Sequence, residues 1–494
     1  MKNLIWMAAL ALTAATWSAC SNDDEPTAAE QSAQSRTYTV TTTLSPRNGA
    51  ATRSTMTDVG GTTGITAEWE VGDQILVGYY KNGSDFVNTT ADVIAVSDGN
   101  DGKVKGTATI RVTLTDPHNG DIEFKYPISF YDDTKNPYTD QTGTLDDINA
   151  NFAGIYGTGL ITVDGSNVTL TPPSSMAPQM CIWKFTFTNG TSNITSDITK
   201  LVINIPENDQ TYTVTPSSQS PIYVAMYGYG FSTPKSISIY AKTATGVYRM
   251  SAASITLAAG KTYTSTGVAL SSAATANVVA GDLGKVIGAD GNIYPNANIA
   301  TTFGTTARAV IAYVGSVPKY FSHFIAIALE DVVPSTTYYY WADALGKVGD
   351  FAAAHPITIG STTYNTSTTG STYYDQVQGN KSVSSATATA AQTGWRLPSI
   401  TDWRYIFEGF GGPKVSAQAG VNGGTGMSYG NGEALCNAIN TACGNTALSR
   451  SNYWTSSEYE GNSEYVWFYG FWDGITEIGK KAQNQYQVRA VFAY

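Results

Sequence analysis

A run of aromatic and polar residues late in the 494-residue chain could bind a ligand. Aromatic side chains occur on both faces of the strand expected over 465–471, so not all of them are easily hidden and some should reach the surface. Exposed rings stack on sugars or anchor protein partners, and nearby carboxylates and amides can orient the ligand. The candidate ligand-binding residues are Tyr459, Glu460, Asn462, Tyr469, Trp472 and Asp473.

The sequence patterns of common enzymes are missing from the chain. It has no GxSxG, HExxH, P-loop or Rossmann glycine pattern in a persuasive context. Its three histidines are scattered, which argues against a zinc site or a histidine-based triad. The triplet Asp-Gly-Asn at 290–292 is typical of a hairpin turn. It matches only part of a calcium-binding loop, because the remaining ligand positions are missing. We therefore expect no enzyme, no metal site and no cofactor. Calcium binding is possible, but no motif in the sequence supports it.

Two cysteines could carry thiol chemistry, but their spacing argues against a disulfide. Cys436 and Cys443 lie in a segment that reads as a helix ending at Gly444. Seven residues on one helix span about 10 Å, which is too far for a bridge. Two packed thiols, or a surface disulfide if the helix breaks between them, are the simpler interpretation, and an enzyme that uses these two residues remains an alternative. Cys181 lies in an alternating strand and is expected in a core.

The first twenty residues have the pattern of a secretion signal. Lys2 precedes an apolar stretch over 4–16 that is too short to span a membrane. Small residues before Cys20 resemble a bacterial lipobox, in which this cysteine carries the lipid, and ordinary cleavage after Ala19 is the alternative. The segment 21–36 has the composition of a flexible tether, and the acidic run 21–25 at its start resembles a signal for export to the outer surface. We expect a lipoprotein held on the outer membrane by its acyl chains.

Composition and patterning indicate a mainly β chain of two to four domains. Hydrophobic residues make up 42% and charged residues 14%, and strands rich in Thr and Tyr suit β-sandwiches. The net charge of −11, without a basic stripe, argues against a nucleic-acid partner. The expected units are a β-sandwich over 37–171, a second over 172–270, a small-residue linker, and an α+β domain over 277–494.

An ordered set of features in the first unit resembles the fimbrillin family, the subunits of type V pili of Bacteroidetes. The set comprises the lipidated start, the Thr-rich strand 37–44, the arginines that follow it, and the pattern from Trp69 through Gly72-Asp73 to Ile75. The resemblance implies two successive transthyretin-like β-sandwiches. It also implies cleavage after an arginine, at Arg53 or next at Arg47, loss of the first strand, and its replacement by a strand from another pilus subunit. The alternative is that these are solvated loop arginines.

Motifs in the last unit resemble the Lcl-like domains, which share the C-type lectin fold. They are the segment 394–399, an expected helix with Ser399 and Asp402 as a capping box, the segment 453–458, and the terminal strand near 488–492. The resemblance implies an α+β head in which Trp454 and Trp467 are buried. The triplets of calcium-dependent sugar-binding lectins are missing, so both a glycan and a surface protein remain open as ligands.

Together these features predict a subunit at the tip of a surface pilus that accepts a donor strand and presents the head as an adhesin. A terminal strand built into the head leaves none to donate, which favours the tip. One alternative is a glycan-binding surface lipoprotein that never polymerises. The other is an enzyme on the lectin-like fold.

Overall fold

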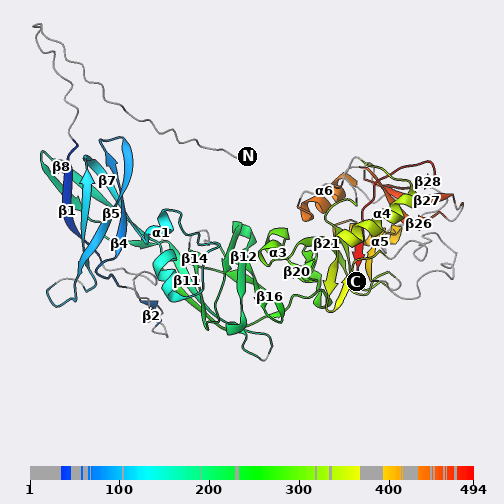
Figure 1. Cartoon of the computed structure of the whole chain (residues 1–494), viewed down its shortest axis with the longest axis horizontal. Coiled ribbons are helices and arrows are strands. Elements are labelled where there is room, and N and C mark those ends of the chain that lie inside the picture. The colour runs from blue at the N-terminus through cyan, green and yellow to red at the C-terminus, as the bar shows by residue number, and fades with distance from the viewer. Residues whose placement is uncertain are drawn as a thin grey trace, which may run out of the picture.

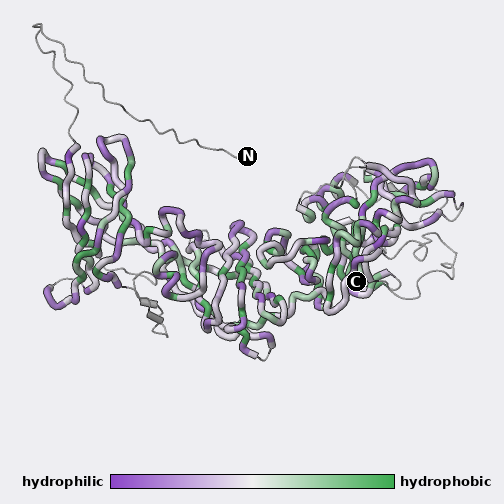
Figure 2. Tube along the Cα trace, in the orientation of Figure 1, coloured by the Kyte–Doolittle hydropathy of each residue, from purple (hydrophilic) through white to green (hydrophobic). Residues whose placement is uncertain are grey.

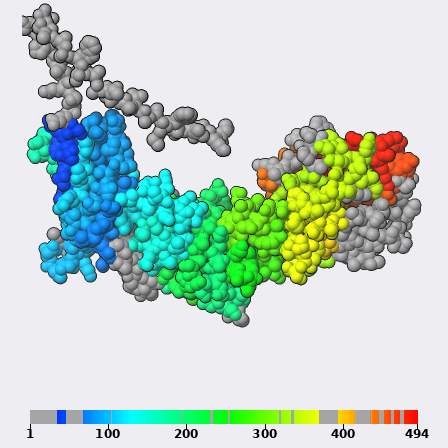
Figure 3. Space-filling model, viewed as in Figure 1, coloured from blue at the N-terminus to red at the C-terminus, as the bar shows by residue number. Residues whose placement is uncertain are grey.

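The computed structural model is mainly β, as the sequence predicts. It describes residues 35–45, 57–58, 65–66, 68–102, 105–190, 192–228, 233–317, 320–332, 337–367, 393–412, 414, 432–444, 448, 451–459, 462, 464–471 and 475–494. These residues form three lobes that follow one another in chain order along an elongated molecule (Figures 1 and 3). Within the described residues, none of the helices has the length and apolar character needed to cross a membrane.

The first lobe is a curled antiparallel sheet in the order β1-β6-β5-β4-β7-β8-β10, with β9 also paired to β8. Hydrophobic and hydrophilic residues alternate along its strands (Figure 2), so one face fills the core. The strands are β1 (Thr37–Leu44), β4 (Gln74–Lys81), β5 (Asp85–Val96), β6 (Ala108–Thr115), β7 (Pro117–Tyr126), β8 (Ile155–Asp164), β9 (Asn167–Thr171) and β10 (Ala177–Pro178). The short strands β2 (Thr57–Asp58) and β3 (Ile65–Thr66) pair with each other.

The middle lobe is a sandwich of two sheets, β14-β11-β17 and β13-β12-β15-β16-β18. Alternating residues of both sheets meet in one hydrophobic core. Its strands are β11 (Met180–Thr188), β12 (Lys200–Ile205), β13 (Gln210–Val214), β14 (Ile222–Tyr227), β15 (Lys235–Thr243), β16 (Gly246–Ile255), β17 (Thr262–Ala269) and β18 (Ser271–Ser272). Short 3-10 turns are η2 (Thr195–Asp197) and η3 (Pro206–Asn208).

A helical insertion between β7 and β8 joins the first two lobes. It contains α1 (Ile128–Tyr131), α2 (Leu145–Asp147) and the π-helical turn η1 (Ile148–Phe152). Ile148 and Phe152 are fully buried against Met180, Ile182 and Ala225 of the middle sandwich. The insertion therefore covers the outer face of β11 and β14 with apolar side chains that belong to the first lobe.

The third lobe, here called the head, is built on the sheet β20-β19-β21-β22-β29-β25. Hydrophobic clusters cover both faces of this sheet. Its helices and turns are η4 (Thr275–Asn277), η5 (Ala280–Asp282), α3 (Ala297–Thr302), α4 (Trp341–Ala354), α5 (Ile400–Gly409) and α6 (Gly432–Ala442). Its strands are β19 (Val286–Gly288), β20 (Ile293–Tyr294), β21 (Ala307–Val314), β22 (Phe324–Ala328), β23 (Ile357–Ile359), β24 (Thr362–Tyr364), β25 (Gly394–Arg396), β26 (Asn452–Glu458), β27 (Tyr465–Gly470), β28 (Ile475–Lys480) and β29 (Val491–Ala493).

Helix α5 begins as its sequence predicts. The Ser399 side chain accepts a hydrogen bond from the Asp402 backbone N–H, and the Asp402 carboxylate accepts one from the Ser399 N–H. Trp403, Ile406 and Phe407 are fully buried at helical spacing. Helix α6 also forms where expected, and Gly444 follows it with a left-handed φ of 74°.

Candidate functional site

The aromatic strand β27 is covered on both faces. Tyr469 is fully buried, and its ring centroid lies 4.4 Å from that of Phe407 on helix α5. On the opposite face, Phe468 packs 4.3 Å from Tyr486. The prediction that Tyr469 binds a ligand is therefore wrong. Helix α5 covers one face of β27 and the loop around Tyr486 covers the other, and the alternating pattern of the strand does not reveal either layer.

The loop between β26 and β27 keeps two of the other candidates near the surface. Tyr459 is half-buried, with its ring edge-on to Trp467 at 5.7 Å. Asn462 is exposed, and its side-chain oxygen accepts a hydrogen bond from the Glu464 N–H. Glu460, Trp472 and Asp473 lie outside the described residues. Within the described chain no group of three potential metal ligands occurs.

The two cysteines of the head are separate, buried thiols. Cys436 and Cys443 both carry reduced thiols, and their sulfur atoms face different carbonyl groups, those of Leu448 and Ala328. Burial raises the pKa of the Cys443 thiol, and the neighbouring Arg489 only partly offsets this. A neutral, buried thiol is a poor nucleophile, which disfavours the thiol-enzyme alternative.

Strand β1 is an edge strand that fills part of the first core. It pairs with β6 along its whole length, and its residues alternate between exposed and inward positions. Its inward side chains, Tyr38, Val40, Thr42 and Leu44, occupy alternate positions and therefore share one face of the strand. These side chains lie opposite Leu114, Val112, Ile110 and Ala108. Removing β1 would uncover an apolar row and leave one edge of β6 unpaired.

The Trp-Gly-Asp pattern that follows in the sequence holds the end of β1. The indole N–H of the buried Trp69 donates to the carbonyl oxygen of Ser45, 3.1 Å away. Gly72 adopts a φ of 96°, and the Asp73 carboxylate accepts a hydrogen bond from the Glu70 N–H. Only glycine adopts such a φ readily, so this turn positions Trp69. Cys20, Arg47 and Arg53 lie outside the described residues.

The strand β29 lies inside the head sheet. It pairs with β22 on one side and with β25 on the other, and its three residues are fully buried. This strand cannot be released for pairing elsewhere without opening the central sheet of the head.

The head is packed against the outer face of the middle sandwich. Tyr240 stacks near Tyr294 at 6.2 Å, and Val202 and Val247 join the same apolar cluster as Phe303. Lys200 and Lys242 donate hydrogen bonds to the carbonyls of Thr302 and Phe303 at the end of α3, where a helix carries partial negative charge.

The segment expected to be a linker is hydrogen-bonded on both sides. Ser271 and Ser272 pair with β16, and the Ala273 N–H donates to the Val247 carbonyl. The Ile293 N–H of the head in turn donates to the Ala273 carbonyl. The middle sandwich and the head are thus joined by continuous backbone pairing.

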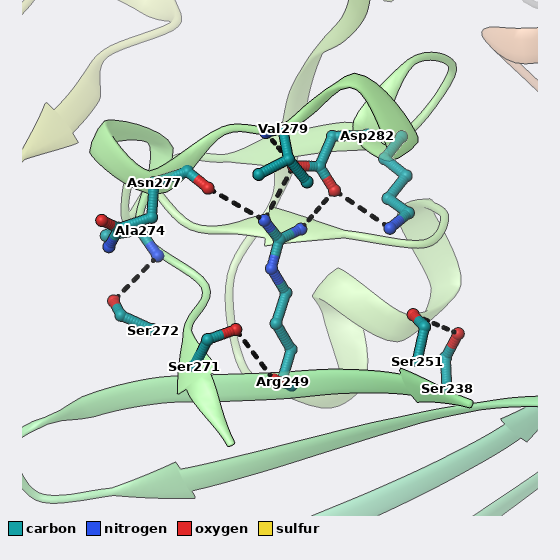
Figure 4. A network of polar contacts seen from close by, with 10 residues as sticks. Ser238, Arg249, Ser251, Ser271, Ser272, Ala274, Asn277, Val279 and Asp282 are labelled. Carbon is teal, nitrogen blue, oxygen red and sulfur yellow. Dashed lines mark hydrogen bonds and ion pairs between the residues drawn. The ribbon is translucent and has the colours of Figure 1, made fainter. Parts of the chain in front are cut away.

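A buried ion pair completes this junction (Figure 4). Arg249 projects from β16, and its two terminal nitrogens lie 2.6 and 2.7 Å from the carboxylate oxygens of Asp282. Asp282 also accepts hydrogen bonds from Lys285 and from the Val279 N–H. Burial opposes ionisation of Asp282, but these donors outweigh it and hold its pKa below the usual value.

The junction has no clear signal in the sequence. Arg249 and Asp282 are 33 residues apart and belong to different lobes, so no local spacing connects them. The alternating pattern of β12 and β15 could have indicated that another part of the chain packs here, because Val202 and Tyr240 are apolar and lie on the face opposite the sandwich core. Apolar residues on both faces of a strand indicate a second covering layer.

The chain matches no protein-family model. A search of curated proteins also finds no match. Among solved structures, it is similar to a fimbrial protein from Bacteroides ovatus, with 11% identity over 88% of this chain and 96% of that chain and a TM-score of 0.24.

Proposed function

We propose that this chain is a subunit of a surface pilus that accepts a donor strand in place of β1. The observation that carries the proposal is the position of β1 at the sheet edge, fully paired with β6 and contributing Leu44 to the core. Its loss would create a groove that needs a strand with apolar residues at every second position. The resemblance of the sequence to fimbrillins suggests the same exchange, with cleavage at Arg53 or Arg47.

The head is proposed to be the adhesive end of the pilus. Pairing of β29 on both sides supports a tip position, since this strand is not free to be donated. We also propose that the protein lies on the outer cell surface and carries a lipid on Cys20 before maturation. Its ligand would be a glycan or a surface protein of another cell.

Strand exchange can be tested with an arginine-specific protease and a fluorescent peptide of residues 35–45. The full chain, once cut after Arg53 or Arg47, should exchange its own β1 for the peptide, and the uncut chain should not. A peptide with Val40→Asp and Leu44→Asp is the matched control, because it places charges against the apolar row of β6. The R47A/R53A variant should keep β1 attached to the rest of the chain and should not exchange it.

Mass spectrometry of the cut chain separates the outcomes. If cleavage at Arg53 is complete and no peptide exchanges under any mild condition, the acceptor proposal fails. A surface-derived protein whose amino terminus remains Cys20 would favour the lipoprotein that never polymerises. Binding of the full chain to glycan and host-protein arrays, with and without calcium, tests the adhesive role separately.

A further inference from the structure

A pocket of about 590 Å³ lies at the junction of the middle sandwich and the head. Strands β16 and β18 form one wall, and the loop that contains η4 and η5 forms the other. Arg249 stands between these walls, with Ser271 and Ser272 on one side and Ser251 on the other (Figure 4). The volume falls within the range of about 300–1,000 Å³ that is typical of small-molecule sites.

The charged groups of this pocket leave an excess of positive charge. Arg249 and Lys285 both bind the same carboxylate, that of Asp282. Each oxygen of that carboxylate already accepts two hydrogen bonds, so Asp282 is saturated. Two cations therefore share one anion, and Lys285 remains 23% exposed at the pocket. In a chain with a net charge of −11, this is a local site for an anion.

The other lining groups suit a ligand that carries hydroxyls. Ser271 donates its hydroxyl proton to the Arg249 carbonyl, which leaves its oxygen able to accept a hydrogen bond. Ser272 accepts a hydrogen bond from the Ala274 N–H, which leaves its hydroxyl able to donate. Met250 and Val279 add apolar surface, and Val279 is 58% exposed. Donors, acceptors and an apolar flank together match the mixed surface of a sugar ring.

We propose that this junction pocket binds a carboxylate-bearing sugar, with the carboxylate at Lys285 and the ring hydroxyls at Ser271 and Ser272. The carboxylate supplies the second anion that the two cations lack, and the serines distinguish a sugar from a simple organic acid. The site is separate from the aromatic strands of the head and from the β1 groove. The proposal goes beyond the pilus function and does not depend on strand exchange.

Isothermal titration calorimetry of the full chain tests the pocket with four probes. Sialyllactose and a glucuronate-terminated disaccharide are the acidic probes, and lactose and cellobiose are the neutral controls. We expect at least one acidic probe to bind at least tenfold more tightly than its neutral control. Added salt should weaken that binding, because the contact is between charges near the surface.

Substitutions locate the site. Lys285→Gln removes the excess charge but leaves the Arg249–Asp282 pair in place, so the variant should fold and lose at least tenfold in affinity for the acidic probe. Ser272→Ala should weaken binding by a few-fold. Lys347→Gln is the matched control, since Lys347 is an exposed lysine on α4 of the same head, and it should bind like the unmodified chain.

The outcomes are decisive. Binding of an acidic probe that Lys285→Gln abolishes and Lys347→Gln preserves supports the pocket. If neither acidic probe binds, or if Lys285→Gln binds as tightly as the unmodified chain, the proposal is overturned and the ion pair serves only to hold the junction. Either result leaves the peptide-exchange test of β1 unaffected, so failure of this site and failure of the pilus function are distinguishable.

Discussion

Arg249 of the middle sandwich and Asp282 of the head form a bidentate ion pair, with nitrogen–oxygen distances of 2.6 and 2.7 Å. Their side chains are 9% and 1% exposed. Around the pair, backbone pairing through Ala273 and an apolar cluster that includes Tyr240 join the same two lobes. Moving the head away from the middle sandwich would therefore break an ion pair, backbone hydrogen bonds and apolar contacts together.

Breaking the ion pair on one side should destabilise the junction strongly. Asp282→Asn leaves the Arg249 guanidinium buried without its counterion, and the expected loss is about 3–5 kcal/mol in the free energy of unfolding. Denaturant unfolding followed by tryptophan fluorescence measures it. The control is Asp350→Asn on α4, whose partner Lys347 is exposed, and it should change little. Equal stability of both variants would show that the pair does not hold the lobes together.

The same pair should make stability depend on pH. The pKa of Asp282 is lower in the folded chain than in the unfolded one, so its stabilising effect is present above the unfolded pKa of about 3.9 and is lost as the pH falls through the folded pKa. The difference in unfolding free energy between the unmodified chain and Asp282→Asn should therefore be constant near neutral pH and shrink below about pH 4. A difference that grows on acidification would contradict the assigned sign.

Strand β1 should stabilise the first lobe through its inward side chains. Leu44 is fully buried, and Leu44→Ala should cost about 2–5 kcal/mol through lost burial and the cavity left behind. Thr43→Ala is the matched control, because Thr43 is the exposed neighbour on the same strand. Chemical denaturation of both variants would show the difference. Similar losses for both variants would mean that β1 does not contribute to the core as described.

Local patterns predicted the elements of this fold better than the contacts between them. The inward face of β1 and the capping box of α5 follow from period and spacing over a few residues, and both are present. Burial of Tyr469 depends on α5, whose Phe407 is 62 positions earlier in the sequence, so alternation in β27 could not show it. The Arg249–Asp282 pair likewise depends on how two lobes dock, which no single segment encodes.

The cysteines of the described chain should be unreactive while the protein is folded. Burial raises the pKa of the Cys181 thiol to about 12, and Cys436 and Cys443 are 1% and 6% exposed. Labelling with a maleimide at neutral pH should be slow at these three positions and fast after denaturation, as read for each peptide by mass spectrometry. Rapid labelling of Cys436 or Cys443 in the folded chain would revive the thiol-enzyme alternative.

Two tyrosines of the aromatic segment should behave differently when truncated. Tyr469→Ala removes a buried ring packed on Phe407 and Trp403, and the loss should be about 3–5 kcal/mol, the range for large buried aromatic residues. Any loss of ligand binding in that variant would therefore reflect a damaged head. Tyr459→Ala removes a half-buried ring at the edge of the same cluster and should cost clearly less stability than Tyr469→Ala. If an array identifies a ligand and Tyr459→Ala retains full affinity while the head stays folded, the β26–β27 loop is not the recognition surface, and the search moves to other faces of the head.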